Sequence, residues 1–217
     1  MKTNKSRKGF TLIELLVVIA IIAILAVVVV LTLNPAQLLA QSRDSNRVSD
    51  FATLKSAIAL YQVDVSTTWM GVVGTAYIAN VSAPTTTQAG WQSTTTAAGW
   101  GWATAPGTPG IATSTSRGVN GTSTSGGGWM PINFGAISSG APFGSMPIDP
   151  LGNTTANTSC QGGASECAYV YVTSGTQYKL MSKMESTKYM NGGSGDVETG
   201  DGGNTTTTFE QGTNVTY

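Results

Sequence analysis

The residue in the most unusual chemical setting is Glu14, a carboxylate inside a long apolar run. The run covers Phe10–Leu33, and its other polar side chains are Thr11 and Thr32. An acid inside a membrane-spanning helix costs about 2.5–3.5 kcal/mol on insertion scales, so such residues are normally paired and functional. We therefore expect Glu14 to have a partner of opposite charge, and its chemistry to be charge pairing rather than catalysis.

Other residues that could do chemistry are few. The chain has no histidine, which removes the commonest general base and metal ligand. We find no paired carboxylates at a recognisable spacing and no nucleophile motif, and we expect no enzyme activity. Cys160 and Cys167 are close in sequence, and in an oxidising compartment we expect them to form a disulfide. Two unrelated free thiols are the alternative.

Charge is sparse and unevenly distributed along the chain. Charged residues are 10% of the total, against about a quarter in typical soluble domains. Four of the eleven basic side chains precede residue 9, namely Lys2, Lys5, Arg7 and Lys8. The part that follows is mildly acidic and lacks the excess of positive charge that binds nucleic-acid phosphates, so we predict no nucleic-acid partner.

The elements that must position Glu14 begin with the apolar run. As a helix, Phe10–Leu33 would span roughly 36 Å, more than the ~30 Å hydrocarbon core of a bilayer. The positive charges before it predict a cytoplasmic N-terminus and an extracytoplasmic remainder. A secretory signal has a shorter apolar core without an acid. A plain transmembrane anchor fits the length but leaves Glu14 unexplained.

The junction Gly9-Phe10-Thr11-Leu12-Ile13-Glu14, followed by an apolar run, resembles the class III signal of type IV prepilins and pseudopilins. The resemblance implies that a prepilin peptidase removes the basic leader, residues 1–9, and methylates the new amine of Phe10. It also implies a role for Glu14 in assembly, since its carboxylate can neutralise the amine of a neighbouring subunit. Pairing of this kind sets register more reliably than it adds stability.

The family resemblance also predicts partners and location. The partners would be other copies, related pilin-like subunits, the prepilin peptidase, the membrane and an inner-membrane assembly platform. The protein would be a single-pass protein of the inner membrane with its head outside the cytoplasm, and periplasmic or extracellular once polymerised. No cofactor is expected.

An amphipathic helix is predicted over residues 34–65. Asn34-Pro35 predicts a kink or a fresh helix start, with Asn34 as cap and Pro35 at the first position. An apolar stripe recurs every three or four residues, comprising Val48, Phe51, Leu54, Ile58 and Tyr61. Residues 41–50 resemble the post-membrane helix of pilin-like proteins. We expect its charges to face water or neighbouring subunits, with Arg47 and Asp50 able to pair.

A globular head is predicted over residues 66–190, with variable Thr/Ser/Gly/Trp-rich loops at 83–128. In one reading, Trp91, Trp100 and Trp102 form an exposed binding surface. The chain would then be a membrane-anchored adhesin or other binding protein that does not polymerise. In the other reading these side chains fold back onto the sheet, as large apolar residues usually do.

The C-terminal part predicts the sheet. Residues 168–173 favour a strand, Ser174-Gly175 a turn and residues 176–181 the returning strand. Such a hairpin must lie on an apolar surface, most simply the helix stripe. The expected fold class is therefore α+β and pilin-like: a long N-terminal helix, half transmembrane and half amphipathic, packed on a small antiparallel sheet.

The turn at residues 146–153 resembles the Pro-x-Asp-Pro-x-Gly turn of major secretion pseudopilins, which slightly favours that branch over adhesion, motility or competence pili. Beyond it, residues 191–217 are expected to form a flexible Gly/Thr-rich tail. Major pseudopilins bind calcium in a C-terminal loop, so Asp196, Glu198 and Asp201 are weak calcium candidates. Simple solvation of these acids is the alternative.

Overall fold

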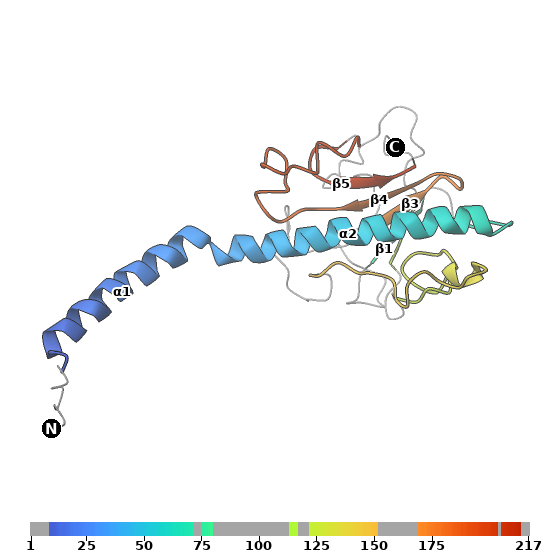
Figure 1. Cartoon of the computed structure of the whole chain (residues 1–217). Helices are drawn as coiled ribbons and strands as arrows, with labels where there is room; N and C mark the ends of the chain where they lie inside the picture. Colours follow the sequence, from blue (N-terminus) through green and yellow to red (C-terminus); the bar gives the residue numbers. More distant parts are fainter. Residues whose placement is uncertain are drawn as a thin grey trace, which may run out of the picture. The chain divides into compact units, whose positions relative to one another are not determined.

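The computed structural model describes residues 9–71, 75–79, 113–116, 122–151, 169–203 and 205–213. The chain divides into two compact units, Met1–Leu39 and Ala40–Tyr217. Figure 1 shows the order of the helices and strands along the chain. Each unit is described by itself.

The first unit consists mainly of helix α1, Leu12–Leu33. Helix α1 ends at Asn34, whose left-handed backbone (φ 39°) terminates the regular hydrogen bonding. Helix α2, Pro35–Asp64, begins at the next residue. Proline suits this first position because its missing N–H would have no helical partner there. The predicted fresh helix start at Pro35 is confirmed.

Helix α2 packs one face into the head. Its predicted apolar side chains Phe51, Leu54, Ile58 and Tyr61 are buried, and Ala57 is buried beside them. Val48 packs at the margin of the same core. The opposite face is exposed, so the periodicity of the sequence predicted which side of the helix the head would cover.

The described strands form one five-stranded sheet of order β2-β1-β3-β4-β5. They are β1 Thr75–Ile78, β2 Thr113–Ser116, β3 Val170–Thr173, β4 Tyr178–Ser182 and β5 Phe209–Gly212. The predicted hairpin is confirmed, since β3 pairs antiparallel with β4 and Val170 lies opposite Met181. Strand β2 departs from the expected antiparallel pattern because it pairs parallel with β1. The α+β fold is otherwise as expected.

Strand β5 contradicts the expectation of a flexible tail from residue 191. Its residues pair antiparallel with β4, with Phe209 opposite Ser182. The ring of Phe209 stacks on Phe51 of α2 at a centroid distance of 5.5 Å. One aromatic side chain therefore anchors the end of the chain in the core, and the described residues of this segment belong to the head.

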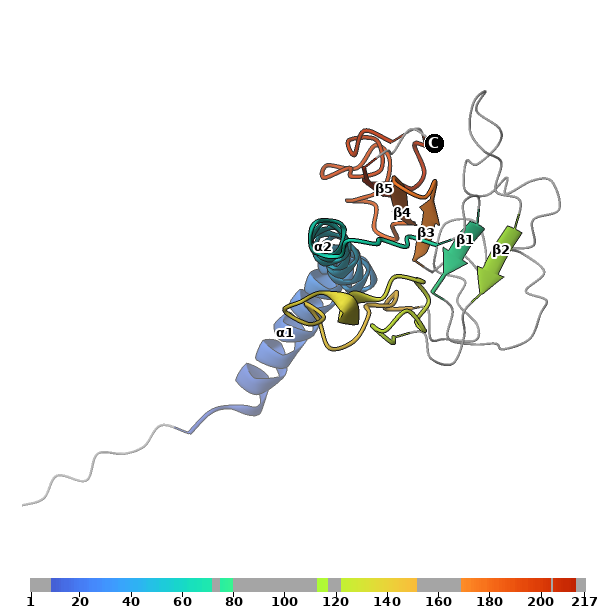
Figure 2. The same ribbon diagram turned by 90° about the vertical axis from the view of Figure 1, so that its right-hand side faces the viewer.

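The core lies between α2, the sheet and the segment 122–151, which runs beside α2 in Figure 2. Phe51 meets Tyr169 edge to face at 5.0 Å. Trp129 is fully buried and donates its indole N–H to the Pro147 carbonyl at 3.0 Å. Large aromatic side chains thus fill much of the core and bring α2 close to the residues around Asp149.

Candidate functional site

The predicted processing junction lies in non-helical chain immediately before α1. Phe10 is 86% exposed, and Gly9 has an ordinary backbone conformation. A Cβ built on Gly9 would meet no atom within 4 Å. Nothing in the described fold therefore requires glycine at position 9.

Glu14 lies in the first turn of α1 and forms a capping box with Thr11. Its Oε2 accepts hydrogen bonds from the Thr11 backbone N–H at 2.8 Å and from the Thr11 hydroxyl at 2.7 Å. The Glu14 N–H in turn donates to Thr11 Oγ1 at 3.3 Å. Each residue satisfies a backbone N–H that the helix start leaves open. Before any neighbour arrives, the carboxylate already has a polar partner.

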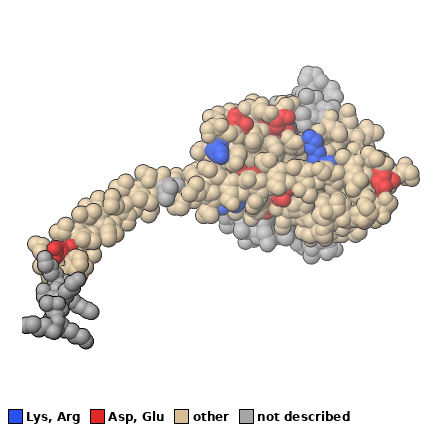
Figure 3. All heavy atoms as spheres, in the orientation of Figure 1, with Lys and Arg blue, Asp and Glu red and all other residues tan. Residues whose placement is uncertain are grey.

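The rest of α1 presents apolar side chains all round. Among the described residues, the helical stretch from Leu12 contains a window long and apolar enough to cross a membrane, and none of that window is buried. Figure 3 shows this surface with almost no charge along it. The Thr32 hydroxyl donates to the Val28 and Val29 carbonyls, both at 3.0 Å. A polar group is thereby satisfied within the helix, as a bilayer requires.

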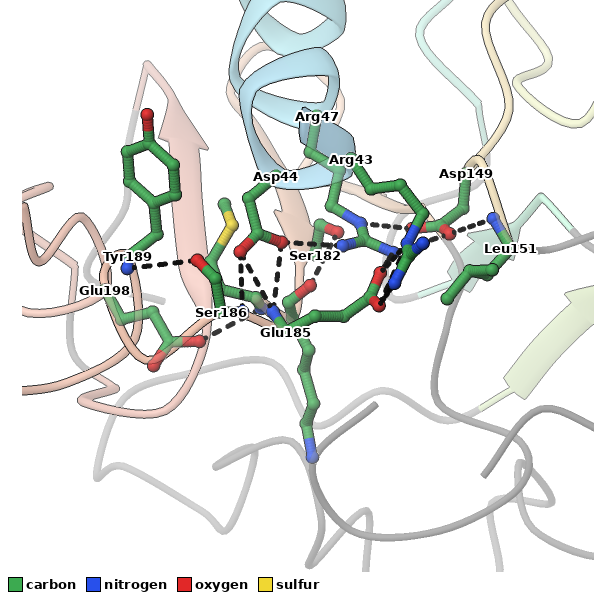
Figure 4. A network of polar contacts seen from close by, with 12 residues as sticks. Arg43, Asp44, Arg47, Asp149, Leu151, Ser182, Glu185, Ser186, Tyr189 and Glu198 are labelled. Carbon is green, nitrogen blue, oxygen red and sulfur yellow. Dashed lines mark hydrogen bonds and ion pairs between the residues drawn. The ribbon is translucent and has the colours of Figure 1, made fainter. Parts of the chain in front are cut away.

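In the head, the side chain of Arg47 is fully buried and surrounded by carboxylates (Figure 4). Its Nε and Nη2 donate to the two oxygens of Asp149 at 2.7 and 2.9 Å. Its Nη1 donates to Asp44 at 2.7 Å, and Nη2 also pairs with Glu185. Burial alone would lower the pKa of Arg47, but the hydrogen bonds and charges of Asp149 and Glu185 outweigh it and raise the pKa. The guanidinium is therefore a permanent charge at this site.

The same carboxylates bind the chain around them. Asp44 accepts the backbone N–H groups of Glu185 at 2.9 Å and Ser186 at 2.8 Å. Arg43 donates to Glu185 at 2.7 Å. We refer to Arg43, Asp44, Arg47, Asp149 and Glu185 as the Arg47 network. It ties α2 to the turn at 149–151 and to the chain after β4.

The network corrects two expectations about α2. Asp44 and Arg47 do not face water, because both are fully buried. Arg47 does not pair with Asp50, whose carboxylate instead accepts the Tyr169 hydroxyl at 2.6 Å. Burial raises the pKa of Asp50, and the Tyr169 hydrogen bond opposes that shift. Arg47 does pair with an acid three residues away, but that acid is Asp44 and not Asp50. Its other nitrogens bind Asp149 and Glu185, which are distant in sequence.

A comparison with protein families matches residues 4–30 to the prokaryotic N-terminal methylation motif. The match covers the basic leader residues from Asn4 on, the Gly9-Phe10 junction and most of α1. The chain carries the N-terminal signal of type IV pilin-like proteins. Comparison with curated proteins and with solved structures gives no match.

The C-terminal acids accept hydrogen bonds from the chain itself. Asp196 accepts from the Gly192 N–H at 2.8 Å and the Thr199 N–H at 3.0 Å. Glu198 accepts from the N–H groups of Met184 and Asn191, at 3.1 and 3.0 Å. Burial raises the pKa of Glu198, whereas the Thr199 hydroxyl and nearby backbone N–H groups lower that of Asp196 to about 2.

Asp201, the third calcium candidate, accepts the backbone N–H of Gly203 at 2.8 Å and that of Glu210. No group of three or more acidic, histidine or cysteine side chains that could hold a metal occurs in the described part of the chain. The three candidates are thus engaged in shaping the loops before β5.

Some predicted residues lie outside the described ranges. These are the leader residues 1–8, Cys160 and Cys167, and Trp91, Trp100 and Trp102. Sequence reasoning missed two features of the described residues. The Thr11 cap was readable from the Thr-x-x-Glu spacing. The burial of Arg47 was not, because nothing local to α2 indicates that Asp149 and Glu185 approach it.

Proposed function

We propose that the pilin-like chain is a structural subunit that a prepilin peptidase cleaves between Gly9 and Phe10 and methylates on Phe10. The mature subunit then polymerises from the membrane through α1. The observation that carries this proposal is the Glu14 carboxylate, held by Thr11 at the start of an apolar helix directly behind the Gly9-Phe10 junction. Cleavage there would create an amine four residues before the carboxylate.

Gly9 supports cleavage at this site because nothing in the described fold requires a glycine there. Glycine is usually retained where a turn or a close backbone approach excludes a side chain. Neither applies here, because a Cβ at Gly9 would meet no neighbour. The requirement for a small residue then comes from outside the chain, and the narrow active site of a peptidase is the partner that the motif implies.

Glu14 supports the assembly step. In the described part of the chain its carboxylate accepts hydrogen bonds from the backbone N–H and the hydroxyl of Thr11, both uncharged donors. A charged amine on Phe10 of a neighbouring copy would offer a stronger, charge-assisted partner. Exchanging one partner for the other would fix the axial position of adjacent helices and leave no unpaired charge in the apolar interior of the filament.

The surfaces of both helices support packing between copies. The described apolar side chains of α1 are exposed all round and need lipid or other helices. The exposed side of α2 includes one stripe of small, uncharged side chains, namely Ser45, Ser49, Ala52, Ser56 and Ala59. Small residues permit close approach of helix backbones. The leader charges favour a cytoplasmic N-terminus, with the head outside and an inner-membrane platform driving polymerisation.

Within the pilin-like class we favour a secretion pseudopilus over an adhesion, motility or competence pilus. The argument is the resemblance of the turn at 146–153 to that of the major pseudopilins. Asp149 of this turn binds Arg47, so the turn has a structural reason to keep its acid. Assembly by the secretion machinery of a host that lacks its own major pseudopilin tests this branch.

The mature N-terminus and the Glu14→Val variant test the proposal. Mass spectrometry of the protein isolated from cells should find a chain that begins at methylated Phe10. Glu14→Val should still be processed and enter the membrane, but should form no filaments. Thr32→Val is the matched control, because it removes a polar group from the same helix and should assemble normally. A wild-type chain that still begins at Met1, or normal filaments from Glu14→Val, would contradict the proposal.

A further inference from the structure

A separate buried ion pair joins the last two strands of the sheet. Lys179 Nζ of β4 lies 3.0 Å from Glu210 Oε1 of β5. The lysine side chain is 4% exposed and the glutamate side chain 0%. Neither residue belongs to the Arg47 network or to the processing junction, so this pair has no part in the function proposed above.

The register of the strands brings the two side chains together. Lys179 lies opposite Gly212, and Glu210 lies opposite Met181. Lys179 and Glu210 are therefore diagonal neighbours on one face of the sheet, within reach of a long side chain. Gly212 has no side chain that could stand between them. The residue before Glu210, Phe209, points to the other face and stacks on Phe51.

The loop before β5 closes over the glutamate. Asp201 accepts the Glu210 backbone N–H, and the Gly203 backbone lies so close that a Cβ there would overlap the Glu210 carboxylate. Burial raises the pKa of the Asp201 carboxyl, and the negative charge of Glu210 raises it further. The site thus holds one amine and two carboxyl groups, with little access for water.

We propose that Lys179 and Glu210 condense to form an intramolecular isopeptide bond. Lys179 Nζ bonds to Cδ of Glu210, and one Cδ–Oε bond breaks. Two of the three ammonium protons leave with that oxygen as one molecule of water, and the third remains on the amide nitrogen. The reaction changes no oxidation state and needs no other reactant.

Three physical features favour this reaction. Reacting groups held in place behave as if present at very high concentration, with effective molarities of roughly 10⁵–10⁸ M in the best cases. Condensation removes two charges whose burial is unfavourable. Little water can enter to hydrolyse the product. The Arg47 network cannot react in this way, because a guanidinium does not give up its proton in proteins.

Mass spectrometry of the full-length chain tests the proposal directly. The protein is purified from membranes in detergent and fully reduced, so that a disulfide cannot alter the mass. We expect an intact mass lower than that of the processed sequence by one water. Protease digestion should give a branched peptide that contains both Lys179 and Glu210.

Two variants separate this bond from any other loss of water. Lys179→Arg keeps the ion pair with Glu210 but cannot form the amide, and it should have its full calculated mass. Glu210→Ala should also have its full mass. Thermal unfolding of Lys179→Arg verifies that the head still folds. A wild-type protein of full mass, or a mass deficit that persists in Lys179→Arg, would overturn the proposal.

Discussion

Arg47 binds carboxylates from three parts of the head: Asp44 on its own helix, Asp149 in the turn and Glu185 after β4. Taking such charges out of water is expensive, and an apolar core of similar shape is often as stable. The network is better understood as selecting one arrangement of these segments over others. Few other arrangements of these segments would leave so many buried charges paired.

Removal of one carboxylate should therefore lower the free energy of unfolding by far more than the net contribution of its ion pair with Arg47. Asp149→Asn leaves Arg47 buried with a weaker partner, and we expect a loss of about 3–5 kcal/mol in the free energy of unfolding. Chemical denaturation of the purified chain measures it. Asp64→Asn is the control, because Asp64 is an exposed acid that accepts hydrogen bonds from Ser138. An equally small effect of both variants would contradict the view that the Arg47 network holds the head together.

Asp50 should make stability depend on pH in the opposite sense to most acids. Burial raises the pKa of Asp50 above its ordinary value of 3.8 in the folded protein. Its stabilising contribution is then fully present below that value and is lost as the pH rises through the folded pKa. Asp50→Asn keeps an acceptor for the Tyr169 hydroxyl and removes this titration.

Unfolding of wild type and Asp50→Asn should therefore be compared at several pH values. The variant should gain stability relative to wild type as the pH increases from acid to neutral. A difference that does not change with pH, or that changes in the other direction, would show that Asp50 titrates normally.

At the scale of elements, the sequence predicted the helices and strands that have a long residue pattern or a pattern confined to neighbouring residues. The helices were predictable because α1 is continuously apolar and the buried face of α2 repeats over many turns. The β3–β4 hairpin was predictable from its β-branched and aromatic residues around a Ser-Gly turn. Strand β5 was missed because its short run, Phe209–Gly212, lacks such a pattern. It gains its place by pairing with β4 and by the stacking of Phe209 on Phe51.

The loop that covers β5 gives a test at the same scale. Gly203→Ala would place a methyl group in the space of the Glu210 carboxylate and force it away from Lys179. The comparison is made in the Lys179→Arg background, in which the pair with Glu210 stays ionic. Breaking a buried pair typically costs about 3–5 kcal/mol, and we expect a loss of this order. Gly144→Ala is the matched control, since a Cβ at Gly144 would meet no atom within 4 Å. Equal stability of the two variants in thermal or chemical unfolding would show that the loop does not hold the pair.

At the scale of the whole molecule, the two units carry different tasks. The residues proposed for processing and assembly lie in Met1–Leu39, whereas both buried ion clusters lie in Ala40–Tyr217. The candidate assembly site could be predicted from the sequence because its motif is contiguous. The Arg47 network could not, since it joins residues that are separated by more than a hundred positions.

The end of the chain should be essential to the head. A chain that stops at Gly203 loses β5, and Phe51 loses its stacked partner Phe209. We expect this truncation to enter the membrane with a protease-sensitive head, because large aromatic residues typically contribute about 3–5 kcal/mol to a core. A chain that stops at Thr213 retains β5 and is the control. Equal resistance of both chains to limited proteolysis would show that the residues after Gly203 are not needed for the fold of the head.

The position of the Arg47 network on α2 has a mechanical consequence. Arg43, Asp44 and Arg47 lie in the first turns of α2 that belong to the head. Tension arriving along the helix from the membrane side would reach these residues before it reached the aromatic core. Their bonds to the turn at 149–151 and to the chain after β4 would be loaded together. Bonds that share a load must break almost simultaneously, so the head would resist being pulled off its helix more strongly than its thermal stability implies.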